Sequence, residues 1–204
     1  MRKVLAATLA ACTLGFASGG ALAVECLPVT TIGAWDDLGS CTQGDKTWTL
    51  NSTDNLADGV TVFFINPSAN SHGMVLAGFD SGDAAGSWAI DYTITVTDPN
   101  FFISAMFAEA DNPGGGSLLN KDVTGDEIFS LVVNNGTPNA GSFRLGLDAT
   151  TLNVNETFSV LAGADLNSVS DTFRQSERVV PEPATLALLG LGLLAAGAVR
   201  RRRS

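Results

Sequence analysis

The chain has 204 residues and a formal net charge of −10 at pH 7. This length leaves room for one sizeable domain once the two termini, which look like targeting signals, are set aside. Between Val24 and Arg178 there are 20 acidic and 5 basic side chains, a net charge of −15. So strong a negative field disfavours nucleic acid and anionic lipid as partners.

The first 23 residues have the three parts of a secretory signal peptide. A basic head, Met1–Lys3, precedes the apolar run Val4–Phe16, and the segment ends in Ala21-Leu22-Ala23. This Ala-x-Ala site predicts cleavage between Ala23 and Val24. Two alternatives stay open: an uncleaved anchor, and lipidation at Cys12, which ends a tetrapeptide with the residue order of a lipobox.

Two cysteines, Cys26 and Cys41, remain once Cys12 leaves with the signal peptide. An even pair in an exported domain predicts a disulfide, which would contribute about 3 kcal/mol through loop-closure entropy. Two free thiols or half of a metal site are the alternatives. No Cys-x-x-Cys motif or nearby histidine favours the metal.

The region from residue 24 to residue 175 predicts an all-β domain. Its strongest signal is Trp88–Val96, where large apolar side chains alternate with polar ones. Further strands are expected at Thr47–Leu50, Val60–Ile65, Met74–Phe79, Phe101–Phe107, Glu127–Val133, Ser142–Leu147, Thr157–Leu161 and Val169–Phe173. Short strands separated by Gly, Asn and Pro turns predict a two-sheet sandwich, either jelly-roll or immunoglobulin-like.

Three segments are expected to connect or to end the domain. Ala108–Thr124 is predicted to be a long loop, and Leu152–Asn155 a connector between strands. Residues 176–183 have little to bury and are predicted to be a linker to the tail.

Few residues of the domain point to catalysis. His72 is the only histidine and lies in a turn-rich polar segment, so we expect a surface residue. The Gly-x-Ser-x-Gly pattern of a nucleophile elbow is absent from the sequence. A glycosidase needs two carboxylates that face one bond, and the sequence cannot select such a pair among so many acids. We therefore expect a protein that is not an enzyme.

Two acidic clusters are weak candidates for calcium. Asp80 and Asp83 flank Ser81-Gly82, and Asp122 and Asp126 enclose a glycine-containing turn. Oxygen ligands close together on a turn suit Ca²⁺, but neither cluster fits the EF-hand pattern. Solvated acidic turns are the alternative, and no other cofactor is expected.

Exposed aromatic side chains could form a sugar-binding platform. The candidates in the sequence are Trp35, Trp48, Trp88 and the pair Phe101-Phe102. Trp88 falls in the alternating strand, where core packing is expected. Adjacent residues of a strand point to opposite faces, so one member of the phenylalanine pair should be exposed or covered by a loop.

The C-terminal segment Ala184–Val199 carries no charge and is apolar on every side. As a helix it would span about 24 Å, against a hydrocarbon core about 30 Å thick. Its all-round apolarity and its glycines favour a transmembrane helix over a soluble core helix. The cluster Arg200, Arg201, Arg202 and Arg203 should remain cytoplasmic, which places the acidic domain across the membrane.

The order of parts in this tail resembles the PEP-CTERM sorting signal. Pro181, Glu182 and Pro183 precede the Leu/Gly/Ala helix, and the arginine cluster follows it. The resemblance implies recognition by a membrane enzyme of the exosortase class, cleavage near Pro181-Glu182-Pro183, and delivery to the cell surface. It also implies a Gram-negative bacterium that makes extracellular polysaccharide and a link to biofilm matrix.

A weaker resemblance covers the residues from Cys41 to Trp48. They are similar to a Cys-x-x-Gly-Asp-Lys-x-aromatic segment found in many PEP-CTERM proteins, with an earlier cysteine like Cys26. Trp48 stands where phenylalanine is more usual. This similarity favours the disulfide and the sandwich and implies nothing about activity.

The sequence thus predicts an exported structural protein of the cell surface or the extracellular, polysaccharide-associated matrix. The alternative is a carbohydrate-binding module, which requires an exposed aromatic group, and less expected is a hydrolase of matrix polysaccharide. Expected partners are an exosortase-type enzyme, extracellular polysaccharide and, transiently, the inner membrane with the domain on the periplasmic side.

Overall fold

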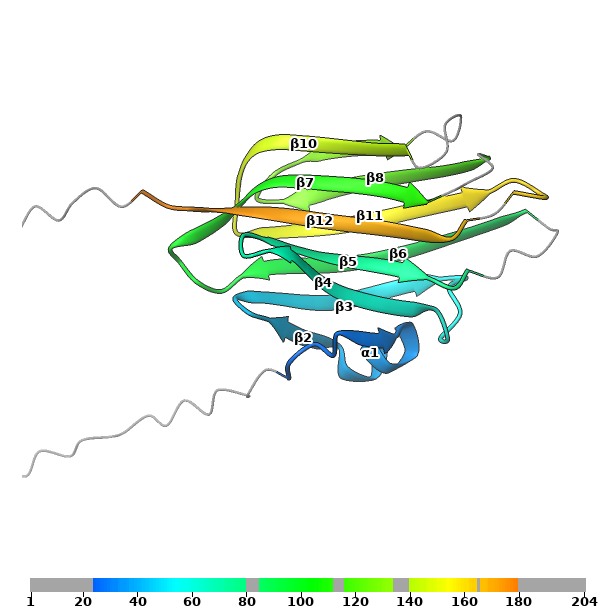
Figure 1. Cartoon of the computed structure of the whole chain (residues 1–204), viewed down its shortest axis with the longest axis horizontal. Helices are drawn as coiled ribbons and strands as arrows, with labels where there is room; N and C mark the ends of the chain where they lie inside the picture. Colours follow the sequence, from blue (N-terminus) through cyan, green and yellow to red (C-terminus); the bar gives the residue numbers. More distant parts are fainter. Residues whose placement is uncertain (1–23, 80–84, 112–115, 134–139, 165, 180–204) are drawn as a thin grey trace, which may run out of the picture.

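The computed structural model describes residues 24–79, 85–111, 116–133, 140–164 and 166–179. These residues form twelve strands and one short helix (Figure 1). In chain order the elements are β1 (Val29–Thr31), α1 (Ile32–Leu38), β2 (Ser40–Gln43), β3 (Lys46–Asp54), β4 (Thr61–Ser68), β5 (Ser71–Ala77), β6 (Gly86–Val96), β7 (Phe101–Asp111), β8 (Ser117–Gly125), β9 (Phe129–Val133), β10 (Ala140–Ala149), β11 (Thr151–Val160) and β12 (Ser168–Glu177). The predicted all-β class is confirmed.

The strands form two six-stranded sheets that face each other. One sheet, here called sheet A, has the order β2-β3-β6-β11-β8-β9. The other, sheet B, has the order β1-β4-β5-β12-β7-β10. All ladder pairings are antiparallel, and Figure 1 shows the two layers with β4, β5, β12, β7 and β10 in front. The two-sheet sandwich is confirmed.

The strand order is that of a jelly roll. The hairpin β8–β9 is enclosed by the pair β7–β10, then by β6–β11, then by β5–β12. These nested pairings are those of one long hairpin wrapped around a core, with β5-β12-β7-β10 facing β6-β11-β8-β9. The topology therefore decides between the two sandwich classes that the strand pattern left open.

The core lies between the sheets, where inward-facing residues alternate with outward-facing ones. The alternation predicted for Trp88–Val96 is seen on β6, where Ile90, Tyr92 and Ile94 are fully buried. Trp88 is half-buried and packs against the core, with its ring stacked on Phe158 at 5.7 Å between centroids. The expectation of core packing for Trp88 is confirmed.

The helix α1 was not anticipated from the sequence. Thr31 caps its N-terminus by accepting a hydrogen bond from the Ala34 N–H at 3.2 Å, and Gly39 ends it with φ of 68°. Ile32 and Trp35 are buried, so the helix covers one end of the core. A helix of seven residues is too short for its apolar periodicity to be recognised in the sequence.

The N-terminal segment is fastened to β2. Cys26 and Cys41 form the predicted disulfide. Beside it, Val24 and Thr42 are joined by a backbone hydrogen bond of 2.7 Å, as are Cys26 and Thr42.

Two predictions about connectors are wrong. The segment Ala108–Thr124 holds the end of β7 and most of β8, and Leu152–Asn155 lies inside β11. Each of these two segments lies beside or contains a charged residue that points inward, Lys121 on β8 and Glu156 on β11. These charges interrupt the apolar alternation by which strands are recognised.

The C-terminal boundary of the domain also differs from the expectation. β12 continues to Glu177, because Ser176 and Glu177 pair with Phe102 and Phe101 of β7. Within the described residues no helix is both long and apolar enough to cross a membrane. The transmembrane helix expected at residues 184–199 lies outside them.

Candidate functional site

The sole histidine is inside the fold. His72 lies on β5, is 8% exposed, and has Nε2 3.8 Å from Oδ1 of Asp45. Burial and the Lys46 charge lower its pKa, and the Asp45 charge offsets this only in part. The expectation of a surface residue is wrong, because the polar segment around His72 folds into the strand β5 with this side chain inward.

A buried lysine, Lys46, lies near His72 and contacts side chains of both sheets. Lys46 on β3 contacts Oδ1 of Asp45 at 2.5 Å and donates to Oε1 of Gln175 on β12. Gln43 accepts from Nε1 of Trp48 at 3.1 Å. The contact between Lys46 and Gln175 thus joins β3 of sheet A to β12 of sheet B.

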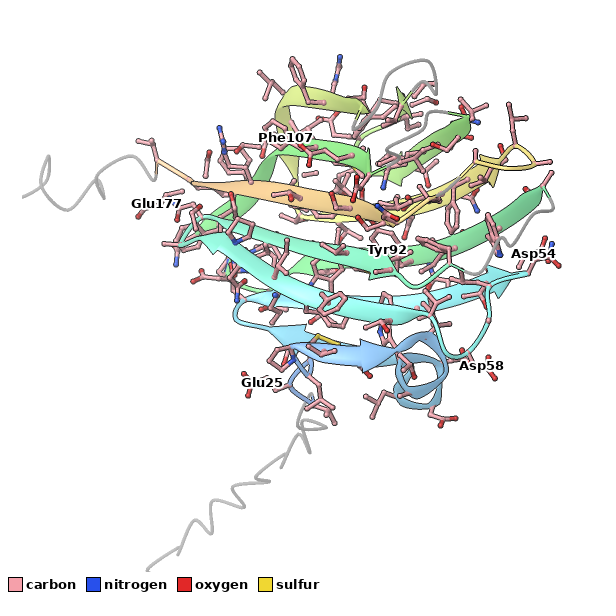
Figure 2. All side chains as sticks on the ribbon, turned by 45° about the vertical axis from the view of Figure 1, so that its right-hand side comes forward. Glu25, Asp54, Asp58, Tyr92, Phe107 and Glu177 are labelled. Carbon is pink, nitrogen blue, oxygen red and sulfur yellow. A yellow bond between two sulfur atoms is a disulfide. The ribbon has the colours of Figure 1, made fainter. Side chains whose placement is uncertain are left out.

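A cluster of four polar side chains lies deeper in the core, here called the acid–lysine cluster. Lys121 of β8 donates to Oε2 of Glu156 on β11 at 2.8 Å and is in direct contact with Oδ1 of Asp171 on β12. Tyr92 of β6 donates to Oδ2 of Asp171 at 2.5 Å. Figure 2 shows Tyr92 between the two sheets, and all four side chains are at most 1% exposed.

Burial governs the titration of this cluster. Burial, followed by the negative charge of Asp171, raises the pKa of Glu156 to about 8. Burial alone would lower the pKa of Lys121, but the charges of Asp171 and Glu156 outweigh it and raise that pKa. Burial and the Asp171 charge likewise raise the pKa of Tyr92 well above its ordinary value.

The calcium candidates do not converge on one point in the described part of the chain. Asp122 accepts a hydrogen bond of 2.6 Å from the Ser130 hydroxyl, and Asp126 caps the turn that leads into β11. No group of three or more metal-ligating side chains is found among the described residues. Asp80 and Asp83 lie outside them.

The Asp126 turn gives a pH-dependent prediction. Its Oδ2 accepts from the backbone N–H groups of Thr150 and Thr151 and from the Thr150 hydroxyl at 2.7–2.9 Å, which lowers the pKa of Asp126. Because the pKa of Asp126 is lower in the folded state, its ionisation stabilises the fold at pH values above the ordinary pKa of 3.8. This stabilisation is lost as the pH falls through the pKa of the folded state. Asp126→Asn should cost on the order of 1 kcal/mol near neutral pH. Urea unfolding from pH 7 to pH 2 should show this difference vanish in acid.

Asp122→Asn is the matched control for that series, since Asp122 accepts only the Ser130 hydroxyl among the hydrogen bonds found in the described residues. It should change stability less than Asp126→Asn at neutral pH. A difference between wild type and Asp126→Asn that stays constant down to pH 2 would contradict the capping role.

The predicted aromatic platform does not form from the predicted residues. Trp35 and Trp48 are fully buried, and Trp88 packs on the core. Of the phenylalanine pair, Phe101 packs against the core and Phe102 lies beneath the Arg178 guanidinium at 5.2 Å.

Two other phenylalanines form a stacked pair on the outer surface of sheet B, in which Phe143 is exposed and Phe107 is half-buried. Phe107 on β7 and Phe143 on β10 are direct cross-strand partners, with stacked rings 6.1 Å apart. Phe143 is 63% exposed, and Arg174 of β12 lies over the Phe107 ring at 5.3 Å. Phe107 can be located in Figure 2. The pair could not be expected from the sequence, because the alternation of inward and outward residues along β7 is interrupted.

The phase change is visible in the burial of β7. Ala105 and Met106 are both buried although they are adjacent, and the register against β12 shifts at Arg174–Gln175. Strict alternation from Ile103 would have turned Phe107 inward. The irregularity turns it outward instead.

Polar groups continue the outer surface next to the aromatic pair. A depression of about 300 Å³ is lined by Glu109, Ala110 and Asp111 of β7 and by Ser168 and Ser170 of β12. Gly141 of β10 lies across from Glu109, and a Cβ at this position would lie 3.3 Å from Cγ of Glu109. We call the surface formed by Phe107, Phe143, Arg174, Thr172, Glu109 and Ser170 the aromatic face.

The described part of the chain is thus a jelly-roll β-sandwich with a buried acid–lysine cluster in an apolar core and an aromatic face on the outer surface of sheet B. Residues 179–203 match the PEP-CTERM protein-sorting motif, so the chain carries this sorting signal. The motif implies an exported protein and is generally processed by an exosortase. Pro181, Glu182, Pro183 and the arginine cluster fall within the match but outside the described residues. Ala21 and Ala23 of the expected signal-cleavage site also lie outside the described residues.

No curated protein shows significant sequence similarity to this chain. Among solved structures, TmCBM61 in complex with β-1,4-galactotriose is 15% identical with a TM-score of 0.35, over 64% of this chain and 88% of that one. Tailspike protein 4 of bacteriophage CBA120 is 17% identical with a TM-score of 0.30, over 64% and 19%. An exo-β-agarase is 12% identical with a TM-score of 0.28, over 70% and 24%. At these values the likeness says nothing about what the chain binds.

Proposed function

We propose that this chain is an exported, non-catalytic polysaccharide-binding protein of the cell surface or extracellular matrix. The observation that carries the proposal is the stacked pair Phe107–Phe143 on the outer surface of sheet B, in which Phe143 is exposed. An exported domain that holds polysaccharide in this way would act as a structural component of the matrix.

The composition of the aromatic face suits a sugar chain. A sugar ring has an apolar face that packs on an aromatic ring and a rim of hydroxyl groups that need hydrogen-bond partners. Phe143 supplies the ring, while Arg174, Glu109 and Thr172 place donors and acceptors on the same surface. A site with few aromatic groups and several placed polar groups is the usual form of a small-ligand site.

The carboxylates that lie close to one another are not placed for catalysis on a polysaccharide. Glu156 and Asp171 both contact Lys121 Nζ, but their side chains are 0% and 1% exposed, so a polysaccharide cannot reach them. Glu109 of the aromatic face and Asp111 of the adjacent depression lie on the same side of one strand. A glycosidase instead places its two carboxylates on either side of the bond that is cleaved.

The sorting motif supports an export route that forms part of this proposal. The signal peptide exports the domain to the periplasmic side while Arg200–Arg203 hold the tail in the inner membrane. An exosortase-type enzyme then cleaves near Pro181-Glu182-Pro183 and passes the domain to the surface. Cleavage of the signal peptide after Ala23 leaves Val24 as the first residue.

Affinity electrophoresis in gels that contain the producer's own extracellular polysaccharide tests the binding. The wild-type chain should be retarded, and Phe143→Ala should raise the Kd about tenfold, since stacking on one ring contributes about 0.5–1.5 kcal/mol beyond the area it buries. Val132→Ala is the matched control, because Val132 is an exposed apolar residue of β9 in sheet A. Equal retardation of both variants would refute the aromatic face as the binding surface.

A reducing-end assay on the same mixtures tests the absence of catalysis. The wild-type chain should release no reducing ends from the polysaccharide over the binding experiment. Release that Glu109→Gln abolishes would show instead that the protein is a hydrolase.

A further inference from the structure

The acid–lysine cluster places an amine against a carboxyl group across the sandwich. Lys121 belongs to β8 of sheet A and Asp171 to β12 of sheet B, and Nζ of one is in direct contact with Oδ1 of the other. The third member, Glu156, is the cross-strand neighbour of Lys121 and contacts the same Nζ at 2.8 Å. A nucleophile, an electrophile and a second carboxyl group therefore meet at one point.

We propose that Lys121 and Asp171 form an intramolecular amide bond that joins the two sheets covalently, with Glu156 as the proton carrier. This inference goes beyond the proposed function and does not depend on it.

The reaction balances without any co-reactant. Lys121 passes a proton to the Asp171 carboxylate, with which it is in contact, and becomes a neutral amine. The lone pair of this amine then attacks Cγ of the resulting Asp171 carboxylic acid. Glu156, protonated near neutral pH, donates its proton to the departing hydroxyl and takes one from the attacking nitrogen. One N–C bond forms, one C–O bond breaks, one water molecule leaves, and Glu156 is restored with no change in oxidation state.

Burial favours the neutral amine and acid that react, while the charges of Asp171 and Glu156 favour the protonated amine of Lys121. Removing an ion pair from water is costly, so an amine and a carboxylic acid are less unfavourable in the core than in solution. The raised pKa of Glu156, about 8, leaves it protonated near neutral pH and able to donate to the leaving group. The Tyr92 hydroxyl polarises the Asp171 carboxyl through its hydrogen bond of 2.5 Å.

Packing fixes the reacting atoms and keeps water out. Phe158 follows Glu156 two positions along β11, and Phe173 follows Asp171 two positions along β12, with both rings inward and buried. Well-oriented groups of one molecule react with an effective molarity of about 10⁵–10⁸ M. The closed core also protects the amide from hydrolysis.

The bond would join the strand that ends the domain to the opposite sheet. β12 is the last strand before the sorting motif at residues 179–203. A pull applied through the C-terminal end would reach β12 first, and the bond would carry that load to β8 of sheet A.

Intact-mass measurement of the purified full chain tests the bond directly. After reduction and denaturation, the wild-type mass should be lower by one water molecule than the mass of the sequence between its mapped termini. Proteolysis should yield one branched peptide that contains both Lys121 and Asp171. A folded wild-type chain with the full, unmodified mass would overturn the proposal.

Four variants assign the roles. Lys121→Arg should restore the full mass, and Asp171→Asn should lose ammonia in place of water. Glu156→Gln should slow or abolish the loss, and complete cross-linking in this variant would refute its role as proton carrier. Lys46→Met removes the other buried lysine, so the water loss should persist; restoration of the full mass there would overturn the assignment to Lys121.

Discussion

Lys121→Met should lower the free energy of unfolding by about 3–5 kcal/mol, because it leaves two buried carboxyl groups without the nitrogen that both contact. Glu156 and Asp171 both make their ion-pair contacts with Lys121 Nζ, and neither has access to solvent. Urea unfolding at pH 7, followed by circular dichroism, measures the change.

The matched comparison removes the whole polar group at once. A variant that combines Lys121→Met, Glu156→Leu, Asp171→Leu and Tyr92→Phe should recover most of the lost stability, since apolar replacements of buried ion pairs are often neutral or stabilising. A Lys121→Met variant as stable as wild type would show that the cluster is not a closed, charged group. A recovered stability without the amide bond would show that the bond contributes little to equilibrium stability.

Trp48→Ala should cost about 3–5 kcal/mol, the range for deleting a large buried aromatic side chain. The Trp48 ring is fully buried and lies 5.5–5.9 Å from the rings of Phe64, Tyr92 and Phe173. Its Nε1 also donates to Gln43, whose acceptor would be left buried without this partner.

Trp88→Ala is the control for this second series. Trp88 is half-buried at the margin of the core, where water can fill part of the space that the ring leaves. It should therefore cost less than Trp48→Ala in the same denaturant titration. Equal losses for the two variants would contradict the assignment of Trp48 to the centre of the aromatic packing.

The fold class was predictable where the core is purely apolar. The alternation of Trp88–Val96 identified β6, and the turn residues between apolar runs predicted a sandwich. The strand order was not predictable, since the nested pairing of β5 to β12 depends on contacts between residues far apart in the chain.

The errors fall on the residues that form the unusual features. β8 and the first part of β11 were missed because Lys121 and Glu156 occupy inward positions that normally hold apolar side chains. The two strands can bury these charges only because each charge meets its partner in the core. Pattern analysis of single strands cannot detect such a pairing, since the compensating residue lies on another strand.

The aromatic face was missed for a different reason. Phe107 and Phe143 both lie within strands that the sequence predicted, but neither was among the aromatic residues considered for an exposed platform. Only the phase change at Ala105–Met106 turns Phe107 outward, and the edge position of β10 leaves Phe143 uncovered. The expectation of an exposed aromatic group was thus met by residues other than the tryptophans and phenylalanines first considered.

Mapping by nuclear magnetic resonance, with soluble fragments of the producer's extracellular polysaccharide titrated into the labelled chain, tests the central claim most directly. The account predicts chemical-shift changes that concentrate on Phe107, Phe143 and Arg174 and their outward-facing neighbours on β7, β10 and β12. Changes confined to the outer surface of sheet A, or no saturable change at all, would contradict it.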